Sequence, residues 1–205
     1  MPVKAGREYR AMSLLLPATT KRLESDYYVE GAATTFDVPY LLWEYEGIKY
    51  YEVVDRHALD GADMTDIIMQ YNHEGKVFAR NKMGGGKPPT LIAEPQESVF
   101  FIAADLSLTD TSKRMYEDIT TGLIYQMSWA FTVGEDSYDR DTHTRRILKV
   151  KKVYDVSAVS IPANSDTEIS ARSWIDGVVD AEKRETLARL ELSKAKYNYF
   201  FGGNK

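Results

Sequence analysis

The stretch Ile124–Val133 reads IYQMSWAFTV, and large apolar side chains occupy every second position of it. These positions are Tyr125, Met127, Trp129, Phe131 and Val133, and the positions between them are mostly small or polar. Because successive side chains of a β-strand point to opposite faces, the alternation predicts a strand with one face in the core. Ser128 lies on the other face, which we expect to be shallow and accessible, as a nucleophilic serine requires. A solvent-facing strand serine without a chemical role has the same pattern.

The composition is that of a globular protein without disulfides. Of the 205 residues, 43% are hydrophobic and 12% are aromatic, which suits one substantial domain or a domain with an extension. The lack of cysteine excludes thiol nucleophiles and cysteine metal sites. The net charge of −5 gives no electrostatic reason to bind nucleic acid, and no apolar run approaches the roughly 20 residues of a membrane helix. We therefore expect a soluble cytoplasmic protein that binds neither nucleic acid nor membrane.

Strand patterns continue on both sides of this stretch. They are predicted over Tyr27–Thr35, Leu41–Val54 as a hairpin that turns at Glu46–Gly47, Thr90–Ala93, Val99–Ala104, Arg145–Val150 and Val153–Ile161. Helices are predicted over Asp55–Leu59, Thr109–Thr121 and Asp180–Tyr199, while Met64–Tyr71 fits a helix or a strand. The short connections favour antiparallel pairing. The fold class is therefore α+β, built on a mostly antiparallel β-barrel or strongly curved sheet with a few helices around it.

Two residues far from Ser128 supply the other groups of a possible proton relay. His73 lies at a predicted chain reversal in YNHEG (71–75), and histidine exchanges protons near neutral pH. Asp155 interrupts the apolar run VYDVSAV (153–159), where a buried carboxylate needs a partner. That partner is either an imidazole or a nearby basic side chain such as Arg145, and His143 is the alternative third member of the relay.

Four segments carry a resemblance to a known family, and they occur in the expected order. They are EGAATTF (30–36), YNHE (71–74), DITTGLIYQMSWAF (118–131) and VYDVSAVSIPAN (153–164). Together they resemble the prohead maturation proteases of tailed bacteriophages, the family typified by phage HK97. The chain departs from the family pattern at Glu74, where Asp is common, at Ala130, where Gly is common, and at Asp155, where Glu is more usual.

The resemblance implies a serine endopeptidase with a fold like that of the herpesvirus proteases. Its catalytic residues map onto His73, Ser128 and Asp155, and it needs no metal or organic cofactor. Residues 27–175 would form the protease domain, 1–26 an N-terminal arm or edge strand, and 176–205 a C-terminal helical tail. Such an enzyme cleaves scaffold and capsid precursor proteins, and also itself, inside the assembling prohead in the host cytoplasm. Self-association in the prohead is expected as well.

Other functions remain as alternatives. The chain could be an inactive, protease-like capsid assembly or scaffolding protein, although it retains both His73 and Ser128. An α/β-hydrolase is disfavoured because no Gly-x-Ser-x-Gly elbow surrounds Ser128. The loop at Gly84–Gly86 lacks the lysine and hydroxyl ending of a phosphate-binding loop, so nucleotide binding is not expected.

Overall fold

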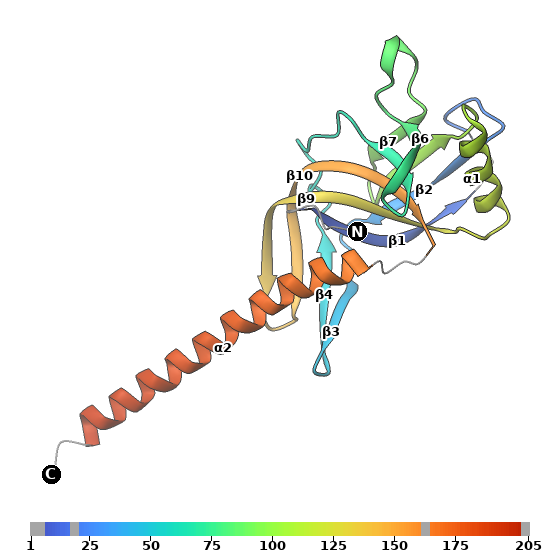
Figure 1. Cartoon of the computed structure of the whole chain (residues 1–205). Coiled ribbons are helices and arrows are strands. Elements are labelled where there is room, and N and C mark those ends of the chain that lie inside the picture. The colour runs from blue at the N-terminus through green and yellow to red at the C-terminus, as the bar shows by residue number, and fades with distance from the viewer. Residues whose placement is uncertain (1–6, 17–20, 161–164, 202–205) are drawn as a thin grey trace.

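The computed structural model describes residues 7–16, 21–160 and 165–201 and shows a sheet-rich α+β fold with a long C-terminal helix (Figure 1). Its strands are β1 (Glu8–Leu16), β2 (Tyr28–Thr35), β3 (Tyr40–Tyr45), β4 (Ile48–Val54), β5 (Ile68–Tyr71), β6 (Glu74–Arg80), β7 (Leu91–Pro95), β8 (Val99–Asp105), β9 (Gln126–Asp139) and β10 (Thr144–Val159). Its helices are α1 (Asp110–Thr120) and α2 (Ser165–Phe201), and Gly84–Gly86 form a 3₁₀ turn, η1.

The hairpin of β9 and β10 forms the centre of the fold. The two strands pair antiparallel, with Ser128 opposite Ser157. The expected strands at 145–150 and 153–161 form one continuous strand as far as Val159, and Ile161 lies outside the described residues. The charged segment 135–144, over which no strand was predicted, extends β9 to Asp139 and turns tightly into β10. The residues near the tip of the hairpin are polar, but backbone pairing between the two strands keeps them in β-structure.

The predicted barrel is wrong, although the α+β class and the mostly antiparallel pairing are confirmed. The main path of strands runs β3-β4-β10-β9-β1-β2-β8-β7, and β5 and β6 branch from β10. Within the described residues, β3 and β7 end this path and each pairs with one neighbour. A barrel requires its terminal strands to pair with each other. Parallel pairing occurs where β10 meets β4 and β5.

The segment 1–26 contributes an interior strand rather than an arm or an edge. β1 pairs antiparallel with β9 on one side and with β2 on the other. Tyr9 lies opposite Ala130, and Ala11 lies opposite Ser128. Because apolar and polar residues alternate only weakly in this segment, the sequence did not predict that its strand joins both halves of the sheet. β1 consequently runs directly beside the strand that carries the candidate nucleophile.

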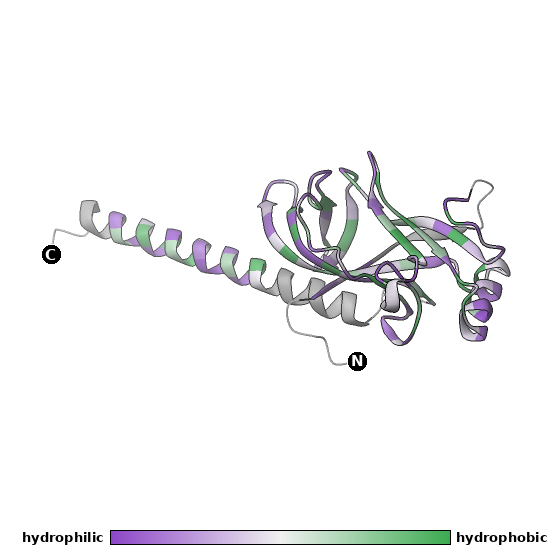
Figure 2. Cartoon of the chain, turned by 90° about the horizontal axis from the view of Figure 1, so that it is seen from above, coloured by the Kyte–Doolittle hydropathy of each residue, from purple (hydrophilic) through white to green (hydrophobic). Residues whose placement is uncertain are grey.

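α1 begins and ends at identifiable signals, and α2 is longer than predicted. Thr109 caps α1, because its hydroxyl accepts a hydrogen bond from the Ser112 amide. Gly122 follows α1 at a φ of 79°, as expected for a helix stop. α2 begins well before the predicted Asp180, lies against β1 and β3, and then projects away from the sheet, where polar and apolar residues mix along it (Figures 1 and 2). Among the described residues, no helix is long and apolar enough to cross a membrane.

The core lies on the face of β9 that the alternation predicted. Trp129 is fully buried, stacks on Phe131 with ring centroids 3.9 Å apart, and contacts Phe100 edge-on. Met127 and Val156 are fully buried as well. The expected helix at Asp55–Leu59 is instead a series of turns, and Met64–Tyr71 contains the strand β5.

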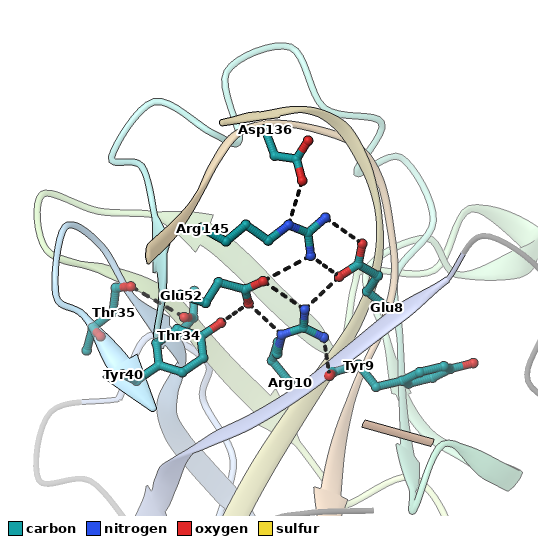
Figure 3. Close-up of polar contacts among 9 residues, drawn as sticks. All are labelled: Glu8, Tyr9, Arg10, Thr34, Thr35, Tyr40, Glu52, Asp136 and Arg145. Atoms are coloured by element: carbon teal, nitrogen blue, oxygen red, sulfur yellow. Dashed lines mark hydrogen bonds and ion pairs between the residues drawn. The ribbon is translucent and has the colours of Figure 1, made fainter. Parts of the chain in front are cut away.

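A charged cluster is buried between the core and the tip of the β9–β10 hairpin (Figure 3). Glu52 of β4 accepts two hydrogen bonds from Arg10 of β1, at 2.5 and 2.8 Å, and one from Arg145 of β10, at 3.1 Å. Glu8 binds both guanidinium groups, and Tyr40 donates to Glu52. Burial raises the pKa of the Glu8 carboxyl, but Arg145 and Arg10 outweigh it and hold that pKa below its usual value. The cluster therefore ties β1, β4 and β10 together.

Candidate active site

His73 lies in the two-residue turn between β5 and β6. Tyr71 pairs with Glu74, so Asn72 and His73 form the turn itself, with φ angles of 48° and 60°. Two successive residues at positive φ define the type I′ hairpin turn, whose twist matches that of the flanking strands. Asparagine adopts this region readily, and histidine is enriched there relative to most residues. The turn therefore projects the imidazole from the end of a rigid hairpin.

Asn72 fixes this turn on β10. Its backbone amide donates to the Ala158 carbonyl at 2.9 Å, and its side-chain oxygen accepts a hydrogen bond from the Ser160 amide at 3.2 Å. Its side-chain amide also lies 3.4 Å from the Ser160 hydroxyl. This role of Asn72 was not predicted, although asparagine is favoured in tight turns and stands directly before the histidine. The contacts hold His73 above the strands that carry Ser128 and Asp155.

The structure brings His73, Ser128 and Asp155 into one hydrogen-bonded chain. The imidazole Nε2 lies 2.7 Å from Ser128 Oγ, and Nδ1 lies 2.5 Å from Asp155 Oδ1. Strand register explains the meeting, because β10 pairs with β9 on one side and with β5 on the other. Ser157 lies opposite Ser128 and two residues from Asp155. The side chains of Ser128, Ser157 and Asp155 therefore point to the same face of the sheet.

Ser157 completes the surroundings of the carboxylate. Its hydroxyl donates to Asp155 Oδ1 at 2.7 Å, so this oxygen receives bonds from both Ser157 and His73. Asp155 is only 3% exposed, and these bonds offset the cost of burying its charge. The expected contact between Asp155 and an imidazole is present, and no basic side chain takes that place among the described residues. Ser157 was missed, although its spacing of two from Asp155 predicts a shared face.

The hydrogen-bond pattern selects one tautomer of His73. An ionised carboxylate only accepts hydrogen bonds, so Nδ1 carries the proton that faces Asp155. Nε2 is then left to accept the hydroxyl proton of Ser128. Tyr9 of β1 packs edge-on against the imidazole, with ring centroids 4.7 Å apart, and limits its rotation. The arrangement can move a proton from serine to histidine while the carboxylate stabilises the resulting imidazolium.

The expectation that Ser128 is accessible is wrong. The residue is 1% exposed, and the His73 imidazole lies against its hydroxyl, although strand alternation correctly separates this face from the core. Alternation assigns a side chain to a face, but it does not reveal what covers that face. A substrate carbonyl must come within about 3–3.5 Å of the attacking oxygen. Substrate entry therefore requires part of this covering to move.

The other two histidines, and the arginines Arg145 and Arg146 of β10, make contacts elsewhere. His143 Nδ1 lies 3.0 Å from the Tyr138 hydroxyl, and His57 Nδ1 lies 3.0 Å from Asp60. His143 was the alternative third relay member, but the position beside Nδ1 of His73 is held by Asp155. Arg145 is part of the buried charged cluster, and Arg146 pairs with Asp37 and Asp55.

A hydroxyl, an imidazole and a carboxylate joined in this order are the groups of a serine hydrolase. Comparison with protein families narrows the class, because the model of the caudovirus prohead serine proteases matches residues 17–178. The chain belongs to this family, whose members are serine peptidases of capsid maturation in the assembling prohead. No curated protein and no solved structure matches the chain, so likeness to the herpesvirus proteases stays a prediction.

The substitution Asp155→Asn tests whether the Asp155 carboxylate orients His73. Asparagine keeps the shape of the side chain, but its amide can donate to Nδ1 and so favours the tautomer that carries the proton on Nε2. We expect kcat for peptide cleavage to fall by about 10⁴-fold, as in a serine relay with this change. Steady-state kinetics of the purified variant would measure the loss, with His143→Ala as the control. A large loss in His143→Ala with activity retained in Asp155→Asn would reverse the assignment.

Proposed function

We propose that the chain is an active serine endopeptidase in which Ser128 is the nucleophile, His73 the general base and acid, and Asp155 the residue that orients His73. The observation that carries this proposal is the continuous hydrogen-bonded chain of Ser128, His73 and Asp155. Ser128 and Asp155 lie 55 and 82 positions from His73 in sequence, and their contacts with its two ring nitrogens, in the order of a serine relay, support the proposal.

The chemistry follows from these positions. Ser128 Oγ attacks the peptide carbonyl while its proton passes to His73 Nε2, and the imidazolium is stabilised by Asp155. The tetrahedral intermediate collapses as Nε2 returns the proton to the leaving amine, which leaves an acyl ester on Ser128. A water molecule then attacks the ester with His73 again as the base. Hydrolysis releases the new carboxyl end and restores the Ser128 hydroxyl.

The proposed substrates are the scaffold and capsid precursor proteins of the prohead, and the chain itself. Family membership supports capsid proteins as the class of substrate. We also propose that copies of the chain associate with one another through α2. This helix exposes Leu187, Leu190 and Leu192 with 51–60% of their surface accessible, which a second copy could cover.

Co-expression with the capsid precursor tests the proposed activity. We expect wild type to shorten the precursor, Ser128→Ala to leave it at full length, and the exposed control Ser98→Ala to act like wild type. Mass spectrometry of the precursor and of the protease itself reports both processing and self-cleavage. Equal shortening by wild type and Ser128→Ala would remove Ser128 from the mechanism.

The second candidate function is an inactive assembly factor, and the burial of Ser128 is the observation that favours it. The same co-expression separates the two functions. A precursor that stays full-length with wild type, in particles that still assemble only when the chain is present, would establish the assembly role. The short hydrogen bond between Ser128 and His73 favours the peptidase, because a purely structural role does not require this geometry.

A further inference from the structure

A cavity of about 350 Å³ opens beside the imidazole of His73, on the side of Asp155. Strands β1, β5, β6 and β10 form its walls, and both His73 and Asp155 line it. Neighbouring residues of an extended peptide are about 3.3–3.6 Å apart. His73 lines the cavity and its Nε2 lies 2.7 Å from Ser128 Oγ, so the cavity is within reach of a side chain about one to three residues from a scissile carbonyl at Ser128.

The cavity contains more unmatched positive charge than negative charge. Its two carboxylates are already paired, since Asp155 binds His73 and Asp66 accepts two bonds from Arg80, at 2.7 and 2.5 Å. Lys152 also lines it and pairs at 2.6 Å with Asp63, which lies outside the lining. The charges of the lining residues thus sum to a positive value.

Arg7 supplies the surplus charge. It pairs with no carboxylate among the described residues, and its guanidinium carbon lies 3.5 Å from the centre of the Tyr154 ring. The stacking holds the guanidinium plane at the cavity while its N–H groups remain able to bind a carboxylate. The hydrogen bond between Thr132 and the Tyr154 hydroxyl, the charge and hydrogen bond of Arg7, and the charge of Lys152 together outweigh burial and lower the pKa of Tyr154, which reflects the same positive surroundings.

We propose that this cavity binds an aspartate or glutamate side chain of the substrate, within three residues of the cleaved bond, and that Arg7 and Lys152 determine this specificity. The inference rests on the proposed peptidase function and names the substrate class of the same site. Arg7 provides a planar, bidentate donor for the carboxylate. The Lys152 ammonium lines the same cavity and, besides its bond to Asp63, has further N–H groups with which to donate to that carboxylate. Gln70, which also lines the cavity, offers an amide donor.

Reversing the charge of the substrate residue and of the two cavity residues tests the proposal. The full chain is co-expressed with the capsid precursor, and new chain ends are identified by mass spectrometry. We expect an Asp or Glu within three residues of each cut. Replacing that residue with lysine should lower wild-type cleavage at least about tenfold, and the variant Arg7→Glu/Lys152→Glu should cleave the lysine-containing precursor better than the original.

The control is Lys149→Glu, which reverses a charge on an exposed residue outside the cavity and should process the original precursor like wild type. Cuts that depend on Ser128 but have no acidic residue nearby would overturn this inference and leave the peptidase proposal standing. A double variant that keeps the wild-type preference would overturn it as well. No cut at all by wild type would overturn both proposals.

Discussion

Replacing either Ser128 or His73 with alanine is expected to lower kcat for peptide cleavage by about a million-fold, the scale of loss found when a serine relay loses its nucleophile or base. The Ser128 hydroxyl does not ionise by itself near neutral pH, so it needs His73 to accept its proton during attack. Without Ser128, His73 has no nucleophile to activate. The 2.7 Å contact between Ser128 Oγ and His73 Nε2 shows that the two groups are already in place. KM is expected to change far less than kcat, because neither substitution removes a substrate-binding group.

The double variant Ser128→Ala/His73→Ala distinguishes a relay from two independent contributions. We expect it to be no slower than either single variant, since each single change already disables the unit. Cleavage of a peptide that spans a mapped precursor site gives the rates, and circular dichroism checks the fold. The exposed histidine variant His57→Ala should retain wild-type kcat. Losses that multiply in the double variant would contradict a shared proton-transfer step.

The substitution Glu52→Ala is expected to destabilise the protein by about 3–5 kcal/mol, the usual cost of removing one partner from a buried ion pair. Glu52 is fully buried and accepts hydrogen bonds from Arg10, Arg145 and Tyr40. Its removal leaves two buried guanidinium groups close together with Glu8 as their shared acidic partner. Urea unfolding followed by circular dichroism measures the change in the free energy of unfolding.

The matched control is Glu135→Ala, which breaks an exposed ion pair with Lys149. Such pairs contribute about 0–1 kcal/mol, so the midpoint of unfolding should hardly move. The two variants remove the same side chain from β-strands of one molecule and differ chiefly in burial. If Glu52→Ala cost no more than Glu135→Ala, the buried cluster would not hold β1, β4 and β10 together.

Local patterns in the sequence predicted those elements whose formation depends on nearby residues. The alternation around Trp129 identifies the β9 strand and its core face, and Glu46–Gly47 identifies the turn between β3 and β4. Gly122 marks the end of α1. Local patterns did not predict the structure where pairing with a distant strand decides it. The polar tip of the β9–β10 hairpin is one such place. The other is β1, whose neighbours β9 and β2 are remote in sequence from each other.

The sequence by itself predicted the three residues of the relay and determined which face of its strand Ser128 occupies, because residue type and the alternation of side chains along a strand are local properties. Only the tertiary structure decided that the sheet stays open, that β1 lies inside it, and that Ser128 is covered. It also decided the contacts of Asp155, which depend on β5 and β9 flanking β10 in one particular register. Register between distant strands arises from packing of the whole sheet, so no single segment encodes it.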